Sequence, residues 1–122
     1  KIIKIHCMKI LHNPRCRKSR ETLEIIKSQN MNCEIILYLK HKLTKKEMKK
    51  IIKMLNINPH ELIRKEEELY KKRFKNKKLS NEEYINIMCE YPILMQRPIV
   101  IKDNKAVLGR PPINVLDLFN KK

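Results

Sequence analysis

Cys16 is the side chain in this sequence with the clearest capacity for covalent chemistry. It lies in the basic segment HNPRCRKSR, residues 12–20, between a short apolar run and a pattern typical of an amphipathic helix. This order predicts a sulfur at a helix N-terminus, where unpaired N–H groups and the helix dipole favour negative charge. Basic side chains on both flanks favour the thiolate over the thiol. The segment therefore indicates a nucleophilic cysteine in an anion-binding loop, and the alternative is a buried cysteine near a basic surface.

Two neighbours of Cys16 could tune its sulfur. Ser19 stands where a CxxC redox motif has its second cysteine, and a hydroxyl cannot form that disulfide. An adduct on Cys16 would then need an external thiol to resolve it. Ser19 could also donate a hydrogen bond to the thiolate, or it could be an ordinary polar residue at a helix start. His12 could tune the thiolate by charge or hydrogen bonding, or it could simply end the preceding strand.

Arginines elsewhere in the chain could hold an oxyanion, namely Arg64, Arg97 and Arg110. A guanidinium can bind two oxygens of one anion in a fork geometry. Arg97 precedes Pro98 and Arg110 precedes two prolines, and rigid proline-flanked loops position a side chain well. Each arginine taken alone is more often a surface cation than an anion ligand, and the proline-flanked Arg97 and Arg110 are the better candidates. Pro98 directly precedes a strand pattern, so the bond before it is a plausible cis peptide.

The composition restricts the class of protein. A chain of 122 residues without a linker or repeat predicts a single domain. The net charge of +16 would normally suggest a nucleic-acid partner. However, the lysines are spread along the chain, and heavy use of Lys, Asn and Ile with a single glycine indicates A/T-rich codon bias. We therefore expect no specific nucleic-acid partner, only weak association with polyanions.

The cysteines and the apolar runs exclude further classes. The four cysteines are far apart, and no pair has zinc-site spacing, so no metal is expected. Nothing marks the chain as secreted, which favours reduced thiols in the cytoplasm. No run approaches the roughly 18–20 apolar residues that span a bilayer, so no membrane association is expected.

The order of elements predicts an α/β fold. Strand patterns at residues 8–11 and 33–38, the second largely buried, flank a helix at about 15–29, which implies parallel pairing. Capping boxes at 44–47 and 80–83 open helices inside a helical insertion at about 41–90. A hairpin at 99–108 and a helix around 115–119 follow. We expect a small mixed sheet with flanking helices in one domain over 1–122, with residues 1–7 as a possible N-terminal extension.

Several motifs in this order resemble the ArsC family of glutaredoxin-coupled arsenate reductases, which is related to the Spx regulators. They are HNPRC at 12–16, LIRK at 62–65, RPIV at 97–100 and GRPP at 109–112. The resemblance extends over residues 8–120 and is closer to the YfgD-type subgroup. It implies a thioredoxin-like fold with a four-stranded sheet and a helical insertion. It also implies reduction of arsenate to arsenite, with arsenate or a similar oxyanion as the bound substrate.

The resemblance also assigns roles. It makes Cys16 the nucleophile and puts His12 near its thiol, with Ser19 in support. The three arginines hold the oxyanion and its arsenic adduct, and Pro98 is the cis proline beside the active cysteine. No bound cofactor is implied, since glutathione acts as co-substrate and glutaredoxin as protein partner of a monomer. The alternative is a non-enzymatic, Spx-like regulator that binds RNA polymerase, although Ser19 removes the CxxC that oxidant-sensing members commonly carry.

Overall fold

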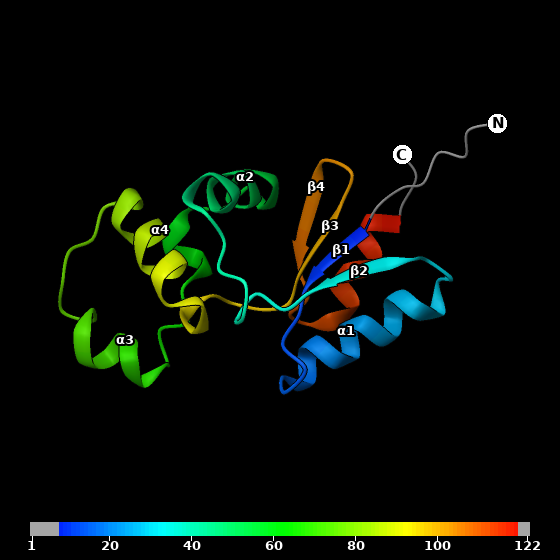
Figure 1. The fold of residues 1–122 in the computed structure, drawn as a ribbon, viewed down its shortest axis with the longest axis horizontal. Coiled ribbons are helices and arrows are strands. Elements are labelled where there is room, and N and C mark those ends of the chain that lie inside the picture. The colour runs from blue at the N-terminus through cyan, green and yellow to red at the C-terminus, as the bar shows by residue number, and fades with distance from the viewer. Residues whose placement is uncertain (1–7, 120–122) are drawn as a thin grey trace. The chain divides into compact units, whose positions relative to one another are not determined.

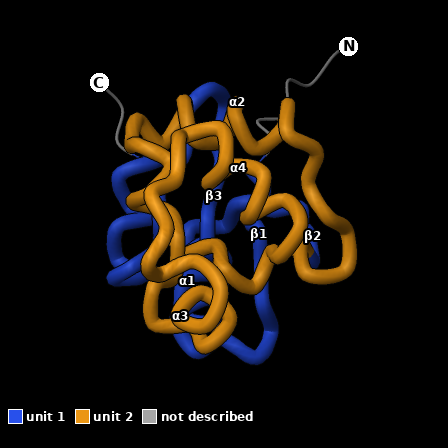
Figure 2. The backbone as a smooth tube through the Cα atoms, turned by 90° about the vertical axis from the view of Figure 1, so that its left-hand side faces the viewer, with its two compact units in different colours: residues 1–37, 97–122 blue, residues 38–96 orange. Residues whose placement is uncertain are grey.

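The computed structural model describes residues 8–119 and divides into two compact units, coloured separately in Figure 2. The first unit comprises residues 1–37 and 97–122, and the second comprises residues 38–96. The possible extension at residues 1–7 lies outside the described residues. The single domain expected from the sequence stays a prediction, and each unit is treated by itself.

The first unit is built on a four-stranded mixed sheet with strand order β2-β1-β3-β4 (Figure 1). β1 (Met8–Leu11) pairs in parallel with β2 (Cys33–Ile36) and antiparallel with β3 (Ile99–Lys102). β3 forms a hairpin with β4 (Lys105–Leu108). The parallel pair and the hairpin are both as the sequence predicts, so the mixed four-stranded sheet is confirmed.

The expectation of a largely buried strand at residues 33–38 was wrong. β2 ends at Ile36, and its central residues Glu34 and Ile35 are exposed, Ile35 by 47%. The reason is topological, because β2 is an edge strand, and among the strands in residues 8–119 it pairs with β1 alone. Tyr38, which was expected in this strand, is buried but belongs to the second unit.

Helix α1 (Arg17–Ser28) connects β1 to β2 and supplies Ile26 to the core of the first unit. That core also contains Met8, Ile10, Val100, Val115 and Leu118. The closing helix is present, but as the 3-10 helix η3 (Pro112–Phe119). Its buried residues Val115 and Leu118 are three apart, and this spacing aligns side chains along a 3-10 helix.

The second unit is helical, with α2 (Lys45–Leu55), η1 (Pro59–Leu62), α3 (Glu68–Arg73), α4 (Asn81–Glu90) and η2 (Pro92–Leu94). Both predicted capping boxes are confirmed. Thr44 Oγ1 accepts from the Glu47 N–H at 3.1 Å, and the Glu47 carboxylate accepts from the Thr44 N–H at 2.9 Å. Ser80 and Glu83 repeat this exchange at the start of α4.

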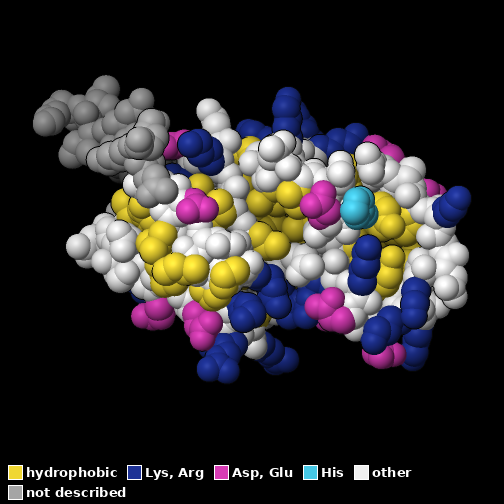
Figure 3. All heavy atoms as spheres, turned by 180° about the vertical axis from the view of Figure 1, so that it is seen from behind, with side chains coloured by type: hydrophobic (Ala, Val, Ile, Leu, Met, Phe, Trp, Pro, Cys, Tyr) yellow, Lys and Arg dark blue, Asp and Glu magenta, His cyan; other side chains and the backbone are white. Residues whose placement is uncertain are grey.

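Lys and Arg side chains occur at several separate places on the face drawn in Figure 3, with Asp and Glu among them. This agrees with lysines that are spread along the sequence. Within residues 8–119, no helix is long and apolar enough to cross a membrane.

Candidate active site

Cys16 caps the N-terminus of α1, as the sequence predicts. Its backbone is extended, the helix begins at Arg17, and the Arg20 N–H donates to the Cys16 carbonyl at 3.0 Å. The Cys16 N–H donates to the Asn13 carbonyl at 2.9 Å, which closes a tight turn before the helix. Cys16 is only 9% exposed. The thiol is thus held at the positive end of the helix dipole, largely shielded from water.

The loop before Cys16 is stabilised by its own polar groups. The side-chain oxygen of Asn13 accepts from the Arg15 N–H at 3.0 Å, a local turn that asparagine favours. The Arg20 guanidinium donates to the Pro14 carbonyl at 2.9 Å. Arg20 therefore reaches back from α1 and holds the loop in position.

The four cations flanking Cys16 are all exposed: Arg15, Arg17, Lys18 and Arg20. Arg17 also pairs with Glu21 at 3.3 Å, one helical turn later. Exposed ion pairs of this kind are weak and are screened by salt. The cations therefore surround the thiol as a long-range positive field rather than as direct ligands of an anion.

His12 and Ser19 form a buried polar pair. His12 Nδ1 lies 2.6 Å from Ser19 Oγ, and the Asn13 N–H donates to the same oxygen at 3.1 Å. Ser19 is fully buried, and His12 is 6% exposed. Hydrogen bonds to the Ser19 hydroxyl therefore connect the residues that follow β1 to the first turn of α1.

The hydrogen bonds at Ser19 Oγ determine which nitrogen of His12 carries the proton. Ser19 Oγ already accepts from Asn13, and its own proton would be buried without a partner if it did not reach His12 Nδ1. An unpaired buried donor costs about 1–3 kcal/mol, so the hydroxyl donates to Nδ1 and the ring proton resides on Nε2. Burial, followed by Arg20 and Lys27, lowers the pKa of His12 below 6.5. His12 is therefore neutral near pH 7, and the Ser19 hydroxyl is used by His12 rather than by the thiolate.

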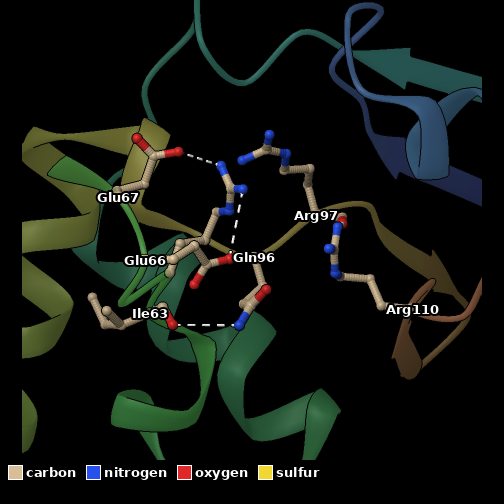
Figure 4. Close-up of polar contacts among 7 residues, drawn as sticks. Ile63, Glu66, Glu67, Gln96, Arg97 and Arg110 are labelled. Atoms are coloured by element: carbon tan, nitrogen blue, oxygen red, sulfur yellow. Dashed lines mark hydrogen bonds and ion pairs between the residues drawn. The ribbon is translucent and has the colours of Figure 1, made fainter.

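Arg97 and Arg110 are brought together within the first unit. Arg110 Nη1 donates to the Arg97 carbonyl at 3.1 Å, and Figure 4 shows the Arg110 guanidinium beside the Arg97 backbone. The Nε and Nη1 atoms of Arg97 are buried, with no hydrogen-bond partner among the described residues. Buried charged donors without partners are costly, so these two nitrogens could hold an anion. The predicted cis bond before Pro98 is confirmed, and the Arg110–Pro111 bond is also cis.

Arg64 belongs to the second unit and is already paired. Its N–H donates to the Leu94 carbonyl at 2.7 Å, and the Gln96 side chain donates to Ile63 at 3.3 Å. Its guanidinium contacts Glu67 at 2.5 Å and Glu66 at 3.7 Å (Figure 4). Within residues 8–119, its Nε is the one guanidinium nitrogen that is buried without a partner. Arg64 is therefore fixed by carboxylates, whereas Arg97 keeps two unpaired nitrogens.

These geometric features agree with comparisons to known proteins. Residues 11–118 match the sequence family described as the ArsC family. The chain belongs to the ArsC family. Its thioredoxin-like architecture is confirmed by an arsenate reductase structure from Vibrio cholerae, with a TM-score of 0.88 and 36% identity. That match covers 93% of this chain and 98% of the other.

Two curated relatives of this ArsC-family chain are similar over nearly their whole length. YfgD of Escherichia coli K12, which is described as uncharacterised, is 42% identical over 113 residues, 91% of this chain and 95% of YfgD. A Haemophilus influenzae protein named arsenate reductase is 40% identical over 112 residues, 90% of this chain and 97% of that protein. The family match and the YfgD similarity agree with the sequence motifs.

The other described thiols differ from Cys16 in their surroundings. Burial, followed by Glu34, raises the pKa of Cys33 to about 11. Burial also raises the pKa of Cys89, and Glu47 adds to the shift while Lys45 opposes it. Both thiols are thus held protonated near pH 7. No group of His, Cys, Asp and Glu within residues 8–119 could hold a metal ion.

Sequence reasoning missed three residues around this ArsC site. Thr22 is fully buried on α1, and Gly109 packs directly against it. Glu67 pairs with Arg64. A signal for Gly109 was available, because it is the one glycine in the chain. No signal distinguished Thr22 from other polar residues, since its role depends on which segments pack together. Glu67 is only three residues after Arg64, and that spacing was the signal available for their ion pair.

Proposed function

We propose that this ArsC-family protein reduces arsenate to arsenite, with Cys16 as the nucleophile. The observation that carries the proposal is Arg97, whose two buried nitrogens lack partners in the unit that holds Cys16 at a helix start. Buried unpaired guanidinium groups favour a tetrahedral oxyanion. Relatives of 34–40% identity are named arsenate reductase, which supports arsenate as that oxyanion.

The first step joins sulfur to arsenic. The Cys16 thiolate attacks arsenate, an As–O bond breaks, and the oxygen departs as water after it takes up protons. Arsenic remains As(V) in the resulting thiolate ester. Arg97 and Arg110 stabilise the charge on the arsenate oxygens, and such donors act most strongly where water is excluded. Neutral His12 can donate from Nε2 during this step, and Pro98 supports the turn that carries Arg97.

The second step transfers the electrons. A glutathione thiolate attacks the Cys16 sulfur, a disulfide forms, and the S–As electron pair stays on arsenic, which leaves as arsenite. Two thiols thus supply two electrons. Glutaredoxin then attacks the mixed disulfide on the glutathione sulfur and releases the Cys16 thiolate. Ser19 explains why outside thiols are needed, because no second cysteine lies at that position. A glutathione-consuming reaction suits the cytoplasm.

Arg64 is the third arginine that the family resemblance assigns to the oxyanion. We propose that it contributes to arsenate affinity, but less than Arg97 does. Its guanidinium already contacts Glu66 and Glu67, so a bound anion must compete with two carboxylates.

The test is arsenite formation by the purified protein with arsenate, glutathione, glutaredoxin, glutathione reductase and NADPH. We expect arsenate-dependent NADPH oxidation that matches arsenite released. Cys16→Ser should abolish both signals, because a serine hydroxyl is a far weaker nucleophile than a cysteine thiolate. Omission of glutathione should stop the reaction at the arsenic adduct on Cys16. Omission of glutaredoxin should stop it after one arsenite per Cys16, with Cys16 held in the mixed disulfide with glutathione.

Cys33→Ser and Cys89→Ser are the matched controls. Both remove a thiol whose pKa is raised, so both variants should keep wild-type rates. A wild-type protein that forms no arsenite, or a Cys16→Ser variant that forms it at the wild-type rate, would contradict the proposal. The former result would favour the Spx-like regulator, which recovery of RNA polymerase subunits with the protein would support.

A further inference from the structure

Gly109 is the single glycine among 122 residues, and its backbone does not require glycine. Left-handed backbone is the usual reason for a glycine. In the described chain those positions are filled by Asn30, Asn56 and Asp103, with φ of 57°, 59° and 57°. Gly109 is not among them. Its value must therefore lie in the space that a side chain would occupy.

That space is already full. A Cβ placed on Gly109 would lie 2.6 Å from Thr22 Oγ1, 2.9 Å from Pro98 Cγ and 3.2 Å from Thr22 Cγ2. Carbon atoms attract most strongly at about 3.5–4.0 Å, so all three distances are repulsive or crowded. Thr22 cannot easily move, because it is fully buried and its hydroxyl donates to the Lys18 carbonyl at 2.8 Å.

Gly109 thereby connects the segments that carry the site. Its N–H donates to the Pro98 carbonyl at 2.9 Å, next to Arg97. Thr22 lies three residues after Ser19, so both point from the same face of α1, and both are fully buried. From this face, Ser19 hydrogen-bonds to His12, and Thr22 packs against Gly109. Arg110 directly follows Gly109 and donates to the Arg97 carbonyl.

We propose that Gly109 is a positioning residue for Arg110: the absence of a side chain lets the end of β4 lie against Thr22 and Pro98, where Arg110 serves the anion site of Cys16. The substrate in this inference rests on the proposed function, but the geometry does not. A side chain at position 109 would push the Arg110 backbone away from α1. Displacement of a binding group by even 1 Å can cost a large factor in rate, up to about 10²-fold.

The experiment uses Gly109→Ala alone and in two double variants. Thr22→Ala/Gly109→Ala removes the two threonine atoms that the new methyl would meet, including the nearest one at 2.6 Å, and leaves Pro98 Cγ at 2.9 Å, so it should restore the site in part. Thr22→Val/Gly109→Ala is the matched control, because valine keeps an atom in the place of Oγ1 and should not restore it. Thr22→Ala alone measures the effect of the truncation by itself.

The readout that needs no reductase activity is alkylation of Cys16, followed by mass spectrometry of its peptide. Iodoacetate is an anion and iodoacetamide is neutral, so their rate ratio measures the positive field at the thiol. We expect Gly109→Ala and Arg110→Gln to lower this ratio alike, by about threefold or more. Thr22→Ala/Gly109→Ala should raise it from the Gly109→Ala value toward the Thr22→Ala value. With arsenate, Gly109→Ala should raise KM by about tenfold and change kcat less.

Equal ratios for the wild type and Gly109→Ala would overturn the proposal. So would a ratio in Thr22→Ala/Gly109→Ala as low as that of Gly109→Ala, or an equal recovery by the valine control. Failure of Thr22→Ala/Gly109→Ala to fold, where Thr22→Ala folds, would also overturn it. If Gly109→Ala alone does not fold, the comparison of the two double variants still decides. If the wild type reduces no arsenate but the ratios follow the expected order, the proposed function fails and the role of Gly109 stands.

Discussion

Arg97 in the first unit and Arg64 in the second unit are similar residues in opposite electrostatic situations. Arg97 buries two guanidinium nitrogens that have no partner in the described part of the chain, whereas Arg64 contacts the carboxylates of Glu66 and Glu67. Both arginines come from motifs that the family resemblance assigns to the oxyanion. The sequence therefore predicts the same role for both arginines, and only their contacts in the structure distinguish them.

The difference shows that an arginine in a family motif need not have a guanidinium that is free to bind an anion. An unpaired buried guanidinium gains charge-assisted hydrogen bonds when an anion arrives. A guanidinium that is already paired exchanges one set of such bonds for another, so its net gain is smaller. The expected effects of mutation follow this order.

The largest effect is expected for Arg97→Gln. Loss of a preorganised donor to a developing charge typically costs about 10²–10³-fold in rate, so kcat/KM for arsenate should fall by that order. Arg97→Lys should recover little, because an ammonium lacks the planar fork. Steady-state kinetics with glutathione and glutaredoxin measures both. Arg73→Gln, which removes an exposed arginine that donates to Tyr91, is the control and should keep the wild-type kcat/KM. A loss under threefold for Arg97→Gln would remove the contrast with Arg64.

A smaller effect of opposite sign is expected for Glu67→Gln. Removal of the carboxylate nearest Arg64 frees its guanidinium for an incoming anion and removes a like charge from it. KM for arsenate should fall by about three- to tenfold, which corresponds to about 0.7–1.4 kcal/mol. Glu66→Gln is the matched control, since Glu66 is 3.7 Å away and exposed, and its effect should be weaker. An unchanged KM in Glu67→Gln would show that Arg64 does not contribute to arsenate affinity.

The buried His12 predicts a pH-dependent stability. Its pKa is lowered by burial, Arg20 and Lys27, so the unfolded chain takes up this proton near pH 6.5 while the folded chain does not. The unfolded state then binds more protons, and the free energy of unfolding should fall as pH drops below 6.5. Well above pH 6.5 His12 is neutral in both states, and its contribution to the pH dependence vanishes. Urea unfolding at several pH values measures the slope.

Two variants isolate this contribution. His12→Gln should flatten the decline, and Ser19→Ala should reduce it, because loss of the donor to Nδ1 raises the pKa of His12. His41→Gln removes an exposed histidine and should leave the profile as in the wild type. If stability between pH 7.5 and 5.5 declines equally in the wild type and His12→Gln, the neutral buried state of His12 is wrong.

The smallest effects are expected at the capping boxes of the second unit. Thr44→Ala and Ser80→Ala should each lower the free energy of unfolding by about 1 kcal/mol, because each leaves a helix-start N–H without its side-chain acceptor. Ser28→Ala, at the exposed C-terminal end of α1, is the control and should cost less. Urea unfolding at pH 7.5 measures all three. A cost near zero at both boxes would mean that these helix starts are held by packing alone.

Much of the fold was predictable because it depends on local patterns. The two capping boxes, the parallel β1–β2 pair and the β3–β4 hairpin follow from spacing and turn residues that lie close together in the chain. The exposure of β2 was not predictable in this way. The same apolar sequence pattern can occur on an edge strand and on a central strand. Only the order of strands in the sheet shows which of the two it is.

The sequence by itself determined the place of Cys16 at a helix start and the family. These depend on residue types in short motifs, and Cys16 caps α1 as its neighbours require. The tertiary structure alone decided which polar groups are already used. Ser19 donates to His12, Glu67 occupies Arg64, and Gly109 packs on Thr22. Each of these depends on segments far apart in the chain, or on burial that packing creates, and no local pattern encodes the distance between two side chains.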